Sequence, residues 1–145
     1  MNNDKITMFD VTLQKTHEWI NDVASELEIS SKVEAFRALR AVLKALRDQL
    51  GTDEAVQLAA QLPVLLRGVY YEGWIPNNGA HVRTEGDFVD LMIQHHGARP
   101  HKSPIEMAEA VVKVAKKHIS ESEVDHVLQR LSTNVRRLFR DTIAV

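Results

Sequence analysis

The sequence predicts an all-α fold of about six main helices, arranged as two pseudo-repeated three-helix units that share one core. Apolar residues recur at spacings of three and four along most of the chain, which is the period of a helix with one buried face. Serines followed three positions later by glutamate mark several helix starts. The helical pattern also restarts after one segment rich in Gly, Pro and Asn. These three observations divide the chain into its predicted elements.

The composition is that of one water-soluble domain spanning residues 1–145. Hydrophobic residues make up 44% and charged residues 26% of the chain, a balance typical of globular proteins. The net charge of −2 gives no bulk attraction to nucleic acid or to anionic membranes. The chain has no cysteine, which excludes disulfides, thiolate nucleophiles and cysteine-based zinc sites.

No targeting or membrane-spanning segment is expected. The N-terminal residues MNNDKITMFD lack the basic and then apolar run of a signal peptide. No apolar segment approaches the roughly 18 residues that a membrane helix needs. We therefore expect a soluble, cytoplasmic protein with no membrane partner.

The first unit, about residues 9–72, begins with two amphipathic helices. Ser31 and Glu34 form a predicted capping box, in which the hydroxyl and the carboxylate satisfy N–H groups that open the second helix. Gly51 follows that helix as a C-cap. The first helix, over about 9–27, has an apolar face of Trp19, Ile20, Val23, Ala24 and Leu27. The second helix has one of Phe36, Leu39, Val42, Leu43, Leu46 and Leu50.

A third helix completes the first unit. Thr52 is its predicted N-cap, and Asp53 and Glu54 place negative charge where the helix dipole favours it. Pro63 falls inside the same apolar pattern. Because proline lacks an N–H group and crowds the preceding turn, we expect a kink or a break there.

A linker over residues 73–85 separates the two units, because Gly, Pro and Asn cluster in it. The second unit is predicted over about 86–141. Its first helix is short and ends near residue 96. Capping boxes at Ser103 and Ser120 open the other two helices, the last of which is expected to run to the end of the unit.

An offset of 69 residues relates the two units. Adding 69, without a gap, places apolar positions on apolar positions and helix starts on helix starts. The matched pairs include Trp19 with Phe88, Val42 with Val111, Leu62 with Leu131, and Tyr70 with Phe139. We interpret the pattern as two units that are each too small to be stable alone and therefore fold against each other.

The stretch LPVLLRGVYYEGWIP, residues 62–76, contains two aromatic residues, Tyr71 and Trp74, that have no aromatic match at this offset. Three interpretations remain open. The rings can pin the linker against the core, or they can line a ligand pocket. They can also form a contact surface for a protein, because Tyr and Trp contribute binding energy at a low cost in entropy.

The run AFRALRAVLKALRDQLGTDEAVQLAAQLPVLLRGVYYEGW, residues 35–74, resembles the core of the bacterial family named "domain of unknown function 2267". The similarity is closest over residues 39–43 and 62–74 and extends more weakly to about Phe139. The segment HHGARPHKSP departs from the family pattern. The resemblance implies an all-helical fold, and it implies no established activity.

The seven histidines raise the question of a metal site. Glu123 and His126 have the Glu-x-x-His spacing of di-iron bundles, but such sites need a second copy of that motif. His95, His96 and His101 surround a Gly/Pro loop and could gather a surface transition metal. We expect ordinary solvent-exposed histidines, with no metal and no cofactor.

Patterns for a catalytic nucleophile are also missing. The sequence has no G-x-S-x-G motif and no glycine-rich phosphate loop. Ser31, Ser103 and Ser120 stand where helices begin, so capping accounts for them. We therefore predict no catalytic residues and expect that the protein is not an enzyme.

A basic stripe follows the second predicted helix. Its members are Arg37, Arg40, Lys44 and Arg47. Their spacings gather them within roughly 80° of arc at about 100° per residue. One interpretation is a face that binds nucleic acid or phosphate. The other is that long cationic side chains lie over the rim of the core and keep their charged ends in water.

The favoured functional prediction is protein–protein interaction or assembly. Its predicted contact surface is Arg67, Tyr71 and Trp74, and its partner is another protein or a second copy of the chain. The alternative is an accessory protein that binds nucleic acid or phosphate through the basic stripe.

Overall fold

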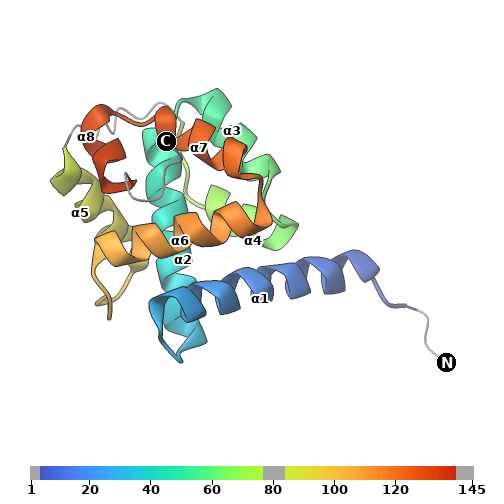
Figure 1. Cartoon of the computed structure of the whole chain (residues 1–145). Coiled ribbons are helices and arrows are strands. Elements are labelled where there is room, and N and C mark those ends of the chain that lie inside the picture. Colours follow the sequence, from blue (N-terminus) through green and yellow to red (C-terminus); the bar gives the residue numbers. More distant parts are fainter. Residues whose placement is uncertain (1–3, 77–83, 140–145) are drawn as a thin grey trace.

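Figure 1 shows the computed structural model of the chain, which describes residues 4–76 and 84–139. In these residues the regular structure is entirely helical, which confirms the all-α prediction. The predicted number of about six helices is wrong, because the described residues form eight α-helices and one 3₁₀ helix. They are α1 (Thr7–Leu27), α2 (Lys32–Gln49), α3 (Thr52–Ala60), α4 (Val64–Tyr71), α5 (Glu85–His96), α6 (Pro104–His118), α7 (Glu121–Gln129), α8 (Thr133–Arg136) and η1 (Arg137–Phe139).

The additional helices arise from two breaks. Pro63 stands between α3 and α4 with φ −53° and ψ 148°, so the expected interruption is a complete break. The helix predicted from Ser120 to about residue 141 is also divided, because Ser132 begins a new helix by accepting the N–H of Val135. Residues 140 and 141, the predicted end of that helix, lie outside the described residues.

Local capping follows the sequence closely. The hydroxyls of Ser31, Ser103 and Ser120 each accept the backbone N–H of the glutamate three residues later. One assignment shifts by a residue, because Leu50 ends α2 and Gly51 becomes the N-cap of α3, with Thr52 as its first residue.

Helix α2 runs through the middle of the molecule, and α1, α4, α5 and α6 pack around it (Figure 1). Every residue from 41 to 47 is buried, so the helix is covered on all sides rather than on one face. Alanines at 35, 38, 41 and 45 allow the neighbouring helices to approach closely. The buried apolar residues of both halves form one cluster.

Several helix bounds in the two halves differ by 69. Adding 69 to the bounds of α3 gives 121 and 129, the bounds of α7. The same shift takes the last residue of α1 to the last residue of α5, and the last residue of α2 to the last residue of α6. The matched residues Trp19 and Phe88 are both buried, as are Tyr70 and Phe139.

No helix within residues 4–76 and 84–139 is long and apolar enough to cross a bilayer.

Candidate functional site

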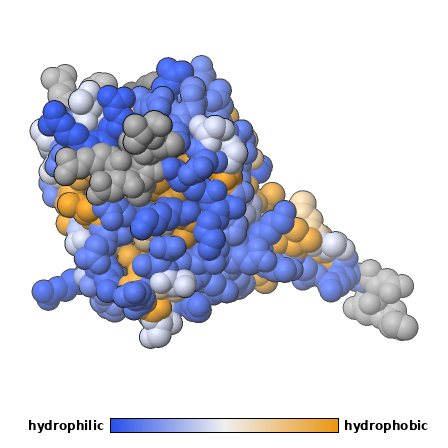
Figure 2. Space-filling model, viewed as in Figure 1, coloured by the Kyte–Doolittle hydropathy of each residue, from blue (hydrophilic) through white to orange (hydrophobic). Residues whose placement is uncertain are grey.

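The N-terminal half of α1 projects beyond the rest of the molecule (Figure 1). The C-terminal half of the helix is packed into the core through Trp19, Val23 and Leu27. In contrast, Phe9 is 58% exposed and Leu13 is 48% exposed. Figure 2 shows hydrophobic residues along this projecting arm. We call residues 7–15 the α1 overhang.

The exposed residues of the α1 overhang continue the buried stripe of the same helix. Residues seven positions apart lie on one side of a helix. Phe9 is therefore aligned with buried Thr16 and Val23, and Leu13 is aligned with half-buried Ile20 and buried Leu27. The side of α1 that faces the core in the C-terminal half of the helix is therefore exposed to solvent in the overhang.

The start of α4 adjoins this surface. The backbone N–H of Leu65 donates to Thr12 Oγ1 at 2.8 Å. Val64 and Leu65 are themselves exposed apolar residues. We define the overhang surface as Phe9, Leu13, Val64 and Leu65.

Of the predicted contact residues, Arg67 lies in the first half of α4, whereas Tyr71 and Trp74 lie at and just beyond its C-terminal end, and all three contact the protein itself. Arg67 donates from Nε to Ala59 O at 3.0 Å and from Nη2 to Leu62 O at 3.1 Å, so it binds one carbonyl at the end of α3 and one in the turn that follows. Tyr71 and Trp74 stack with ring centroids 5.6 Å apart. Both rings are half-buried against the core, so they cover the end of α4 and leave part of their surface to solvent.

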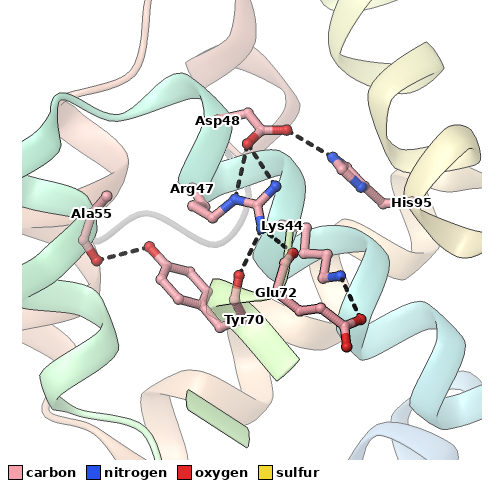
Figure 3. Close-up of polar contacts among 7 residues, drawn as sticks. All are labelled: Lys44, Arg47, Asp48, Ala55, Tyr70, Glu72 and His95. Carbon is pink, nitrogen blue, oxygen red and sulfur yellow. Dashed lines mark hydrogen bonds and ion pairs between the residues drawn. The ribbon is translucent and has the colours of Figure 1, made fainter. Parts of the chain in front are cut away.

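The basic stripe of α2 faces inward over much of its length. Arg47 is only 2% exposed, and Figure 3 shows its guanidinium between α4 and Asp48. Its Nη1 donates to Tyr70 O at 2.8 Å and to Glu72 O at 3.0 Å, while Nη2 pairs with Asp48 Oδ1 at 2.8 Å. Arg47 therefore holds the C-terminal end of α4 to α2.

The other members of the stripe have similar roles. Lys44 is buried and pairs with Glu72 at 3.7 Å. Arg40 donates to His95 O at 3.2 Å and to His96 O at 2.6 Å, which satisfies carbonyls at the end of α5. Arg37 is half-buried. Three of the four cations thus bind carbonyl and carboxylate groups of this chain.

Burial and charge shift the pKa values around this stripe. Burial lowers the pKa of Lys44, although Glu72 opposes that shift. Burial alone would raise the pKa of Asp48, but hydrogen bonds from His95 and Arg47 hold it below its ordinary value. Burial raises the pKa of Tyr70, whose hydroxyl donates to Ala55 O at 2.8 Å.

Glu34 has a different role from the one predicted. As a capping-box residue its carboxylate was expected to serve the start of α2, but its Oε1 contacts His96 Nε2 at 2.9 Å and accepts the N–H of His101 at 3.0 Å. Burial would raise the pKa of Glu34, but the N–H of His101 and the ring of His96 lower it. The carboxylate therefore ties α2 to the α5–α6 loop.

His96 is fully buried, so the expectation of solvent-exposed histidines is wrong there. Its Nδ1 lies 3.1 Å from Ala98 O and its Nε2 lies 2.9 Å from Glu34 Oε1. Both ring nitrogens therefore lie within hydrogen-bonding distance of an oxygen atom. Gly97 follows with φ 79°, a left-handed conformation that suits glycine.

Among residues 4–76 and 84–139, three histidine–carboxylate pairs join the two halves of the chain. They are His95 with Asp48 at 2.7 Å, His96 with Glu34 at 2.9 Å, and His118 with Asp22 at 2.8 Å. In each pair the carboxylate lies on α1 or α2 and the histidine on α5 or α6. The pattern of these pairs was not visible in the sequence, because partners lie 47 to 96 positions apart.

The predicted metal candidates do not come together as a ligand set. Among residues 4–76 and 84–139, no three His, Asp or Glu side chains gather as a metal ion would require. His95 and His96 bind carboxylates, as described above, and Glu123 and His126 lie together only as neighbours on α7. His81 lies outside the described residues.

The chain is similar to a known protein family. The model of the family described as "Uncharacterized conserved protein (DUF2267)" matches residues 16–138. The chain belongs to this family. No curated protein matches it.

The DUF2267 match begins at residue 16, so it includes the packed half of α1 and leaves the overhang outside. Helix α5 is the helix that the offset of 69 matches to α1. Helix α5 begins at Glu85, which corresponds to residue 16. The α1 overhang therefore lies outside the residues matched to the family, and α5 has no corresponding turns.

Proposed function

We propose that this DUF2267 protein acts through protein–protein contact, as an assembly or interaction module, and that it is not an enzyme. The observation that carries this proposal is the uncovered apolar stripe of the α1 overhang. A helical segment of nine residues is marginal in water without tertiary packing. Phe9 and Leu13 are exposed there, and covering them with another protein surface would be favourable.

The contact surface proposed here differs from the predicted Arg67, Tyr71 and Trp74. Arg67 already binds carbonyls at and just beyond the end of α3, and the two rings pack partly on the core. The apolar side chains of the overhang surface are more exposed than Tyr71 and Trp74, and Phe9 and Leu13 belong to the projecting arm, where Figure 2 shows hydrophobic residues. These properties suit the centre of an interface better.

The partner we propose is a second copy of the chain. In an antiparallel pair of overhangs, Phe9 of each copy lies beside Leu13 of the other, so one stripe covers the other symmetrically. Lys5 and Asp10 form an ion pair at 3.4 Å within one copy, so the flanks of the stripe carry both signs of charge.

The expected affinity is modest. Burying a Phe or Leu side chain contributes roughly 1.5–3 kcal/mol, while association costs about 4–15 kcal/mol in lost freedom. Four such side chains in a symmetric pair contribute roughly 6–12 kcal/mol, which falls within the range of that cost and leaves only a small net gain. Mass measurements by analytical ultracentrifugation should therefore extend to about 1 mM protein, where an association free energy of about −4 kcal/mol is still detectable.

The test compares the wild type with the double variant Phe9→Ser, Leu13→Ser. We expect a concentration-dependent dimer for the wild type and a monomer for this variant, with unchanged helical circular dichroism in both. The control is Val33→Ser, Ile105→Ser, which removes two exposed apolar residues from α2 and α6 and should leave dimerisation intact. A wild type that remains monomeric at every concentration would overturn the proposal.

The register is tested with engineered thiols. Because the chain has no cysteine, Phe9→Cys and Leu13→Cys each introduce the only thiol. An equimolar mixture of the two variants should form disulfide-linked dimers faster than either variant alone. Equal rates in all three samples would contradict the antiparallel pairing of these two positions.

We also propose that the two halves are copies of one helical pattern. The equal offset of the helix ends and the burial of matched residues such as Leu62 and Leu131 support this interpretation. Arg67 and Arg136, which are matched, both donate to carbonyls near the end of the preceding helix. A duplicated unit explains why one core is built from both halves.

A further inference from the structure

A groove lies between α3 and α7, the two helices whose bounds differ by 69. Its volume is about 360 Å³, within the range of roughly 300–1,000 Å³ that is usual for small-molecule sites. It shares no residue with the overhang surface, so it is a separate feature of the molecule.

The floor of the groove is apolar. Leu58, Ile119 and Val124 are buried there, and Val127 is half-buried. The same four side chains also line a void of about 20 Å³ inside the core. The same side chains therefore belong both to the floor of the groove and to the hydrophobic core.

The rim of the groove is polar and exposed. Gln57 and Gln61 line it from α3, and Ser122, Glu123 and His126 line it from α7. Glu123 is the one acidic residue among these rim residues. Glu123 and His126 are three positions apart and so lie on the same face of α7.

Some of the residues in the two walls of the groove occupy positions that the offset of 69 matches. Gln57 matches His126 and Leu58 matches Val127 at the offset of 69, and all four line the groove. The apolar pair provides a symmetric floor, whereas the rim has a carboxylate on the α7 wall only. A ligand with one polar end is therefore held in one orientation.

We propose that the α3–α7 groove binds a small amphipathic amine. Its apolar body would lie on Leu58, Val124 and Val127, and its ammonium group would approach the Glu123 carboxylate. The side-chain oxygens of Gln57 and Gln61 provide further acceptors for the N–H groups. The volume and the single rim carboxylate together define this ligand class.

The probe is 1-naphthylmethylamine, compared with 1-naphthalenemethanol and 1-naphthoate, which carry a neutral and a negative group on the same ring system. Each is titrated into ¹⁵N-labelled full-length protein, and amide shifts are followed by NMR. We expect shifts concentrated in α3 and α7. The amine should bind about threefold to fivefold tighter than the alcohol, the effect of one exposed ion pair, and the naphthoate should bind most weakly.

Two variants and one control locate the site. Ala60→Trp fills the groove from the exposed end of α3 and should abolish the shifts. Val33→Trp adds the same ring at an exposed position on α2 and should leave them unchanged. Glu123→Gln should reduce the affinity for the amine to that for the alcohol, without changing the affinity for the alcohol.

Each contrary result has a definite meaning. Absence of α3 and α7 shifts with all three probes, or shifts that persist in Ala60→Trp, would overturn the site. Equal binding of the three probes, or tighter binding of the naphthoate, would overturn the ligand class. Self-association does not affect these outcomes, because the double variant Phe9→Ser, Leu13→Ser can be titrated in the same way.

Discussion

Replacing Glu34 by alanine removes the carboxylate that joins α2 to the α5–α6 loop. The Glu34 side chain is only 6% exposed and that of His96 is fully buried. The substitution leaves His96 Nε2 and the backbone N–H of His101 without their acceptor. Water has little access to His96, so it cannot easily replace the carboxylate.

The expected loss of stability follows from these two contacts. Leaving the buried His96 ring without its acceptor costs about 1–3 kcal/mol, whereas water can replace the carboxylate at the N–H of exposed His101, so the loss for Glu34→Ala should be about 1–3 kcal/mol. That is a large share of the roughly 5–15 kcal/mol by which a typical domain is stable. Glu34→Gln should cost less, because the amide oxygen can still accept the N–H of His101 and the amide NH₂ can donate to a neutral His96 ring.

The contribution of Glu34 also depends on pH. Its pKa is lower in the folded protein than in the unfolded chain, so the unfolded state binds the proton more readily. The stabilisation is therefore fully present above the unfolded pKa of about 4.3. It is lost as pH falls through the folded pKa. The difference in stability between wild type and Glu34→Gln should accordingly shrink between pH 6 and pH 3.

Urea unfolding followed by circular dichroism measures these differences. The matched control is Glu106→Ala, because Glu106 occupies the same capping-box position on α6 but is exposed. Its loss should be at most about 0.5 kcal/mol, as for an exposed surface residue. If Glu34→Ala destabilises the protein no more than Glu106→Ala, the reasoning about the buried carboxylate is refuted.

Three further predictions concern other buried contacts. Arg47→Ala should lower the free energy of unfolding by about 3–5 kcal/mol in urea titrations, because it removes one partner of a buried ion pair; a loss below 1 kcal/mol would contradict this. Tyr70→Phe should cost about 1 kcal/mol at pH 7. Because burial raises the folded pKa of Tyr70, this cost should shrink as pH rises above about 10, where the unfolded tyrosine ionises, and a constant difference would argue against it. Leu62→Ala and Leu131→Ala should each cost about 2–5 kcal/mol in thermal unfolding, and a negligible effect at either matched position would count against equivalent roles.

Interactions within about four residues were visible in the sequence. The serine caps at 31, 103 and 120 follow from a hydroxyl and an N–H three positions apart, so no knowledge of the fold was needed. Pro63 interrupts a helix for an equally local reason. The helical class and most helix starts were predictable on the same grounds. The break at Ser132 was missed, although the Ser-Thr-Asn run there was an available local signal.

Contacts between distant residues were decided by the tertiary structure. Glu34 has the spacing of a capping-box residue, yet it binds His96, 62 positions away. The cations of α2 have the spacing of a surface stripe, yet Arg47 binds the backbone of α4. Helical spacing places side chains on one side of a helix, but it does not specify which other helix packs against that side.

The α1 overhang illustrates the same division between sequence and fold. Periodicity alone determined that α1 has one apolar side, because residues seven apart point the same way. Which part of that side is covered depends on where the neighbouring helices end, and only the packing of α1 against α2, α4 and α6 decided it. The sequence by itself therefore determined helices, caps and breaks through local chemistry. The tertiary structure determined which polar groups are buried and which apolar side chains remain open, because burial depends on every element that packs nearby.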